Sequence, residues 1–115
     1  MGLFHRTPAV DAGSARQLVS DGAVLLDVRE PGEWNAGHAP QAIHQPLGRL
    51  AVADRRFTAG RQVVVVCRSG NRSQHAVKAL RAAGVDALNL SGGMRAWQSA
   101  GGSVVDRKGR PGAVI

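Results

Sequence analysis

The chain has 115 residues, which is enough for one domain with a single hydrophobic core. A hydrophobic fraction of 43% excludes disorder by composition, and the single cysteine excludes an internal disulfide and a cysteine-cluster metal site. The net charge of +7 comes from basic residues spread along the chain without interleaved aromatic residues. This pattern favours a solvated basic surface, so we predict no nucleic-acid partner.

The first half of the chain predicts short strands that alternate with short helices. Asp11 is a good helix N-cap, and Pro31 suits the first position of a helix. The predicted elements are a strand that ends at Val10, a helix that stops at Asp21 and Gly22, a strand at Val24–Val28, a helix that Gly37 terminates, and a strand at Ala42–His44. The segment from Leu47 to Phe57 is ambiguous, because the spacing of Leu47, Leu50 and Asp54 fits a helix but does not establish one.

The second half continues the alternation with stronger signals. The predicted elements are a strand at Val63–Val66, a helix from Asn71 or Arg72 to about Ala83, a strand at Ala87–Leu90, and a short helix that holds Met94 and Trp97 after the turn at Gly92 and Gly93. Four consecutive valines indicate a strand that is buried on both faces. The pattern predicts an α/β fold in which helices cover both faces of a mostly parallel sheet of about five strands.

The only cysteine, Cys67, directly follows the valine strand and precedes a short polar loop and a helix. This is the edge of an open α/β sheet where ligands bind. Loop N–H groups, the helix N-terminus and the guanidinium groups of Arg68 and Arg72 favour an anion, and the same field favours the nucleophilic thiolate. We therefore predict that Cys67 is a reactive thiol, although free cysteines are often merely buried.

The other loop residues have predicted roles around the thiol. Arg72 either grips an anionic ligand or orients the loop, and Arg68 adds a second positive charge. Gly70 allows a tight turn or a positive φ. The remaining loop residues either direct amides or side chains inward or cap the following helix, and these residues are Ser69, Asn71 and Ser73.

Spacing and three motifs carry a family resemblance. Four residues separate Cys67 from Arg72, one fewer than in the C-x5-R loop of cysteine phosphatases. The segment Cys67–Ser73 resembles the active-site loop of the single-domain rhodaneses, which are thiosulfate sulfurtransferases. Two more segments are similar to the N-terminal and C-terminal signatures of that family, and these are Leu25–Pro40 and Asn89–Trp97.

The resemblance implies a rhodanese-like fold, with an N-terminal extension at 1–8 and the domain at 9–101. The segment 102–115 is Gly-rich and charged, so we expect a flexible tail there. It implies that Cys67 attacks the outer sulfur of an anionic donor such as thiosulfate and holds it as a persulfide. The acceptor would be cyanide, a small thiol or a thioredoxin-like protein, and no cofactor is implied. The resemblance also implies that Asp27 and Arg29 brace the active-site loop by hydrogen bonds, against the alternative of an ordinary surface salt bridge.

Two other classes of function stay open on the sequence. One is a C-x4-R arsenate reductase or phosphatase-like enzyme, against which the short loop and the lack of a second cysteine count. The other is a sulfur-relay or regulatory binding module whose loop serves a protein partner.

Several further residues are predicted to be structural. His38 is expected to be a hydrogen-bonded histidine, and Trp34 and Trp97 are expected to anchor the core. His5, His44 and His75 have no partner at metal-ligand spacing, so no metal is predicted. No apolar run near the N-terminus is long enough for a signal peptide or a membrane span, so a cytoplasmic enzyme without a membrane partner is expected.

Overall fold

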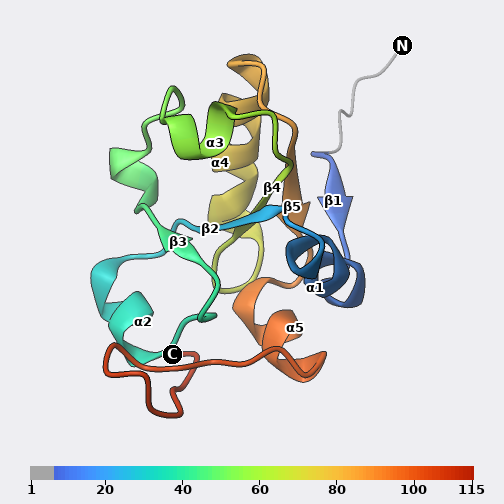
Figure 1. Ribbon diagram of the computed structural model, residues 1–115. Helices are drawn as coiled ribbons and strands as arrows, with labels where there is room; N and C mark the ends of the chain where they lie inside the picture. The colour runs from blue at the N-terminus through green and yellow to red at the C-terminus, as the bar shows by residue number, and fades with distance from the viewer. Residues whose placement is uncertain (1–6) are drawn as a thin grey trace.

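The computed structural model describes residues 7–115 and contains one five-stranded sheet (Figure 1). The strands are β1 (Ala9–Val10), β2 (Val24–Asp27), β3 (Ile43–His44), β4 (Val63–Val66) and β5 (Ala87–Leu90). They lie in the order β1-β5-β4-β2-β3, and every pair is parallel. The α/β fold predicted from the sequence is thus confirmed, and the central strand is the run of four valines.

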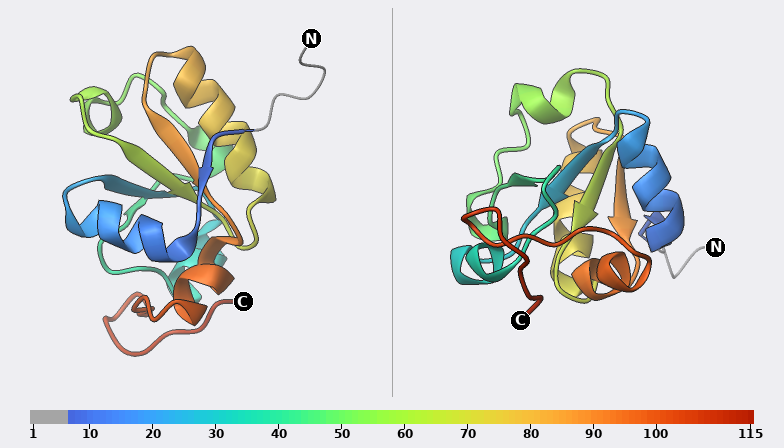
Figure 2. Two further views of the ribbon diagram at one scale, coloured as in Figure 1. Left: turned by 90° about the vertical axis from the view of Figure 1, so that its right-hand side faces the viewer. Right: turned by 60° about the horizontal axis from the view of Figure 1, so that its bottom comes forward.

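Helices cover both faces of this sheet. The helices are α1 (Ala12–Ser20), α2 (Pro31–Ala36), α3 (Arg55–Thr58), α4 (Asn71–Ala82) and α5 (Gly93–Ser99). Helices α4 and α3 lie on one face, and α1 and α5 lie on the other (Figures 1 and 2). Side chains of α4 pack beside Phe57 of α3 in one buried cluster, and side chains of α1 and α5 pack in a second cluster. Because the four valines of β4 alternate between the two packed faces, all of them are buried.

The predicted elements agree closely with the observed ones. Asp11 caps α1 by accepting the N–H of Ser14 at 2.8 Å, and Pro31 occupies the first turn of α2. The ambiguous segment contains a short 3₁₀ helix at Leu47–Arg49 and the single helical turn of α3. Residues 1–6 of the predicted N-terminal extension, and with them His5, lie outside the described residues.

The C-terminal tail does not hang free of the domain. After α5 it crosses the end of the sheet and runs back to α2 (Figure 2, right). His38 and Val105 exchange two backbone hydrogen bonds of 2.8 Å, and the N–H of Ala113 donates to Ala36 at 2.9 Å. This packing corrects the expectation of a flexible tail, which rested on a Gly-rich, charged composition. Composition does not reveal main-chain partners, and here the main chain makes the contacts.

The fold brings the carboxyl ends of β2 and β4 to one edge, since the two strands are parallel neighbours with Asp27 opposite Val66. The residues that follow these two strands therefore lie side by side. No helix among residues 7–115 has the length and apolar character needed to cross a bilayer.

Candidate active site

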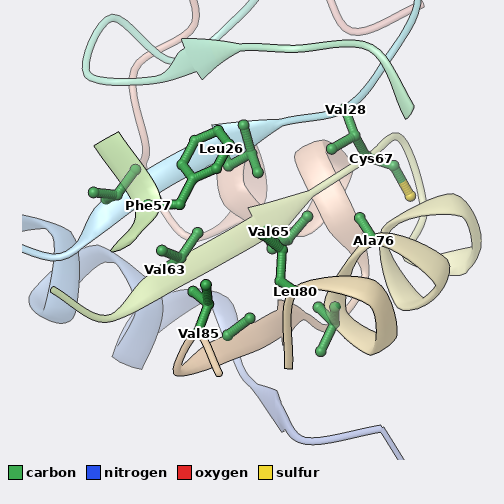
Figure 3. Close-up of a cluster of buried hydrophobic side chains, with 12 residues drawn as sticks. Leu26, Val28, Phe57, Val63, Val65, Cys67, Ala76, Leu80 and Val85 are labelled. Carbon is green, nitrogen blue, oxygen red and sulfur yellow. The ribbon is translucent and has the colours of Figure 1, made fainter. Parts of the chain in front are cut away.

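The thiol of Cys67 lies at the end of β4 and is almost fully buried. Only 1% of the residue is exposed. Figure 3 shows Cys67 beyond the arrowhead of β4, in the cluster that also contains Val28 and Ala76. Its Sγ accepts the N–H of Gly70 at 3.1 Å and lies 3.3 Å from Oγ of Ser73. The thiol thus sits in apolar packing on one side and against polar loop groups on the other.

The loop after Cys67 turns tightly because Gly70 has a φ of +110°, a conformation that favours glycine. Gly70 is the N-cap residue of α4, and no side chain caps the helix there. The predicted tight turn at Gly70 is therefore present. The predicted capping role of Ser73 is not, because its buried side chain points to the thiol instead.

The loop holds the pKa of the Cys67 thiol below its ordinary value. Burial raises this pKa, since it disfavours the charged form. The hydrogen bond between the thiol and the Ser73 side chain, and hydrogen bonds from the N–H groups of Ser73, Gly70 and Ser69, lower the pKa by more than burial raises it. The arrangement therefore favours the thiolate, which is the nucleophilic form.

Asn89 of β5 braces the loop, a role that was not predicted from the sequence. The side chain is buried, with 5% exposed. Its Nδ2 donates to the carbonyl oxygen of Gly70 at 3.2 Å, and its Oδ1 accepts a short hydrogen bond from Oγ of Ser73. The signal was an amide in a strand that is otherwise buried and apolar, because a buried polar side chain needs partners.

The start of α5 braces the other end of the loop. The N–H of Met94 donates to the carbonyl oxygen of Cys67 at 2.8 Å. Gly93, with a φ of +61°, lies so close that a Cβ atom there would stand 2.4 Å from the same oxygen. The paired glycines at 92–93 were predicted only as a turn. The structure shows that the second glycine also permits this close backbone approach.

Arg72 is held by a carboxylate from another helix. Its Nη1 and Nη2 donate to Oε1 and Oε2 of Glu33 at 2.6 and 2.7 Å. The hydrogen bond from Arg72 lowers the pKa of Glu33, although partial burial opposes this shift. Glu33 lies within the signature segment Leu25–Pro40, but its pairing with Arg72 was not predicted. The other loop side chains with predicted roles are exposed, and these are Arg68, Ser69 and Asn71.

Asp27 and Arg29 form a fully buried ion pair, with 0% of either side chain exposed. Nη2 of Arg29 donates to Oδ2 of Asp27 at 2.8 Å and to the carbonyl oxygen of Gly37 at 2.7 Å. The side-chain hydrogen bonds of this pair stay within it or run to Gly37, and none reaches the described residues of the Cys67 loop. The structure thus corrects both expectations. The pair does not brace that loop directly by hydrogen bonds, and it is not a surface salt bridge. The pair fixes the turn after β2 and the end of α2.

Beside this pair lies an aromatic stack. The Trp34 ring stacks on the rings of both His38 and His44, with centroid distances of 3.7 and 4.6 Å. His38 Nδ1 donates to the carbonyl oxygen of Trp34, and His44 Nε2 donates to that of Arg29, each at 2.7 Å. His38 is therefore the hydrogen-bonded histidine that was predicted. Trp34 is half-buried in the stack, whereas Trp97 is buried in the core as predicted.

Among residues 7–115, no three His, Cys, Asp or Glu side chains lie close enough to hold a metal ion. A buried thiolate with N–H donors around it can attack an electrophilic sulfur and then stabilise a negatively charged sulfur at the same position.

A family model described as "Rhodanese-like domain" matches residues 11–100. Two curated relatives are each 38% identical to the chain. The "Uncharacterized protein slr1261" of Synechocystis sp. aligns over 83% of this chain and 54% of its own length. The "Putative sulfurtransferase YtwF" of Bacillus subtilis aligns over 64% of this chain and 72% of its own length.

The fold is also similar to that of a solved enzyme. The crystal structure of thiosulfate sulfurtransferase from Pseudomonas aeruginosa matches with a TM-score of 0.77 and 25% identity, over 95% of this chain and 22% of that chain. The chain thus spans about half the length of the Synechocystis relative and less than a quarter of this enzyme.

Proposed function

The chain belongs to the rhodanese-like sulfurtransferase family, and from this premise we propose that it transfers sulfane sulfur through a persulfide on Cys67. The observation that carries the proposal is the buried thiol at the end of β4, with N–H groups directed at its sulfur and the Ser73 hydroxyl oxygen 3.3 Å from it. The proposed donor class is an anionic sulfur compound such as thiosulfate. Arg68 and the net charge of +7 would attract it to the site.

The proposed first step is an attack of the Cys67 thiolate on the outer sulfur of thiosulfate. A bond forms between Sγ and that sulfur, the sulfur–sulfur bond of thiosulfate breaks, and its electron pair leaves with sulfite. The product is a cysteine persulfide anion, whose terminal negative charge would remain within reach of the loop donors. Such preorganised donors stabilise charge without a reorganisation cost.

The proposed second step returns the enzyme to its starting state. A nucleophilic acceptor attacks the outer sulfur of the persulfide, and Cys67 leaves as thiolate. With cyanide the product is thiocyanate, and with a thiol it is a new persulfide. Because Cys67 is the only cysteine, no disulfide within the chain can release the sulfur. The persulfide should therefore persist until an external acceptor arrives, which gives ping-pong kinetics.

The test is intact-mass spectrometry of the protein after thiosulfate treatment and removal of excess donor. We expect one added sulfur, which cyanide then removes with one equivalent of thiocyanate formed. Cys67→Ser should gain no sulfur, while its thermal unfolding should stay close to that of the wild type because the two side chains have similar sizes. Thiocyanate formation without a sulfur-loaded protein, or intersecting double-reciprocal plots, would exclude the covalent relay.

A further inference from the structure

The ion pair between Glu33 and Arg72 occupies the guanidinium group of the second arginine in the Cys67 loop. Each terminal nitrogen of Arg72 already donates to a different carboxylate oxygen of Glu33. This is the two-pronged geometry by which an arginine would otherwise bind an anionic ligand. The positive charge of Arg72 is therefore neutralised before any substrate arrives.

The position of Glu33 is fixed by its own helix. Oε1 of Glu33 also accepts the backbone N–H of Glu30 at 3.1 Å, which completes a capping box at the start of α2. Only 18% of the Glu33 side chain is exposed, against 37% for Arg72. A carboxylate held from two directions does not swing away freely, so an anion must compete with it for Arg72.

Arg72 also lies within electrostatic reach of the thiol. The hydrogen bond that Arg72 donates to Glu33 is the main cause of the raised pKa of Arg72, and the Cys67 thiolate adds to the same shift. Because Glu33 keeps a lowered pKa beside Arg72, it remains ionised at neutral pH. Any molecule that approaches the sulfur from this side meets a carboxylate as well as a guanidinium group.

We propose that Glu33 is a specificity-determining residue that reduces the reactivity of Cys67 toward anionic molecules relative to neutral ones of the same shape. It does so by occupying Arg72. The inference rests on the proposed function, because it says that Glu33 lowers the preference of the site for anionic sulfur donors over uncharged ones. Thiosulfate would still react, but with a smaller kcat/KM than the loop would allow without Glu33.

The test compares alkylation of Cys67 by iodoacetate and iodoacetamide, two reagents of similar size that differ in charge. The measured quantity is the second-order rate constant for iodoacetate divided by that for iodoacetamide, at fixed pH and ionic strength. We expect Glu33→Gln to raise this ratio about fivefold, the effect of one partly exposed ion pair. Asp21→Asn, which removes the same charge from the exposed end of α1, is the matched control and should leave the ratio unchanged.

The Arg72→Ala variant distinguishes two explanations of the Glu33 effect. Either Glu33 acts by binding Arg72, or its negative charge repels the anion directly. In that variant Glu33 has no cationic partner, so the ratio should fall below that of the wild type. When Glu33→Gln is combined with Arg72→Ala, it should raise the alkylation ratio by less than it does in the wild-type background. The reason is that there is no guanidinium group to release. An equal increase in both backgrounds, or no increase in the single variant, would overturn the proposal.

The alkylation test does not depend on sulfur transfer, so its failure differs from failure of the proposed function. A second measurement links the two. The rate of sulfur loading from thiosulfate should rise in Glu33→Gln by about the factor found for iodoacetate. If the alkylation ratio rises and no variant ever loads sulfur, the selectivity stands and the sulfurtransferase proposal fails.

Discussion

Two adjacent strand ends make different use of buried polar groups. After β2, Asp27 and Arg29 pair with each other at complete burial, so a negative and a positive charge cancel. After β4, the thiol of Cys67 is just as buried, but its neighbours are hydrogen-bond donors without an opposing carboxylate in contact. The carboxylate of the first arrangement is closed to further ligands, although the buried Nη1 of Arg29 has no hydrogen-bond partner among the described residues. The second arrangement attracts a negative charge.

The contrast shows that burial of charged or polar residues does not by itself mark a reactive site. The Asp27 carboxylate receives both nitrogens of a guanidinium fork and the backbone N–H of Arg29, so it has no capacity left for a ligand. At Cys67 the donors of the loop point at one sulfur that can change its charge. A buried group such as the Cys67 thiol becomes reactive where the surrounding hydrogen-bond donors can stabilise a negative charge that the neutral group does not yet carry.

The largest expected effect is on the closed arrangement. Asp27→Asn leaves the Arg29 charge buried without its partner and should lower the free energy of unfolding by about 3–5 kcal/mol. The rate of Cys67 alkylation in the folded protein should stay near that of the wild type. Urea denaturation and iodoacetamide kinetics measure the two quantities.

Asp54→Asn is the matched control, since Asp54 and Arg56 form the same two-pronged pair at the surface. Asn is also a good helix N-cap, so this variant should be destabilised far less than Asp27→Asn. Equal losses in the two variants would show that burial does not set the strength of the pair after β2.

The next effect concerns the close approach between Gly93 and the loop. Gly93→Ala should lower the free energy of unfolding by about 2–4 kcal/mol, because the added methyl group meets the Cys67 carbonyl and the backbone has a positive φ. Gly84→Ala shares the positive φ of +87° but has open space around the new methyl group. That control should lose only about 1–2 kcal/mol, as thermal unfolding will show. Similar losses would remove the steric argument.

Asn89→Leu tests the polar brace of the reactive arrangement. Leu has a similar shape but can neither donate to Gly70 nor accept from Ser73, so buried polar groups lose their partners. The expected loss of stability is about 1–3 kcal/mol. Hydrogen exchange of the loop amides should accelerate more than that of β2. Equal acceleration at both places would contradict a local role for Asn89.

The smallest effect is a shift in the pH profile of the thiol. The hydroxyl of Ser73 makes the largest contribution that lowers the pKa of Cys67, so Ser73→Ala should move the alkylation midpoint to higher pH. Ser69→Ala keeps its backbone N–H and loses only an exposed hydroxyl, so its midpoint should not move. An unchanged midpoint in Ser73→Ala would assign the lowered pKa to the backbone alone.

The same lowered pKa makes the stability of the fold depend on pH. A thiol whose pKa is lower in the folded than in the unfolded state stabilises the fold once it is ionised. The free energy of unfolding should therefore rise from the folded pKa up to the pKa of an unfolded cysteine, and the gain should be lost as the pH falls through the folded value. Cys67→Ser, which cannot ionise, supplies the reference curve.

Local signals predicted most of the framework. The valine run, the cysteine after it and the helix that follows Gly70 were all readable, because each depends on neighbours in the chain. The sequence also indicated the family through motifs in the right order. What it did not reveal were contacts between distant segments, since strand order and helix placement decide them.

Arg72 illustrates this limit. The loop motif indicated an arginine near the thiol, but its carboxylate partner lies 39 positions earlier in α2. The tail is a second case, because its hydrogen bonds to His38 and Ala36 come from the main chain, which every residue carries. Asn89 is intermediate, since a lone amide in an apolar strand signals a partner without naming it.

The brace supplied by β5 and α5 also bears on protein synthesis. The chain grows from its N-terminus, so Cys67 is made before Asn89 and Met94. Until those residues leave the ribosome, the thiol lacks the amide of β5 and the N–H group of α5 that hold its loop in place. The nascent chain should therefore carry an ordinary cysteine, which becomes reactive only when the last strand of the sheet is added.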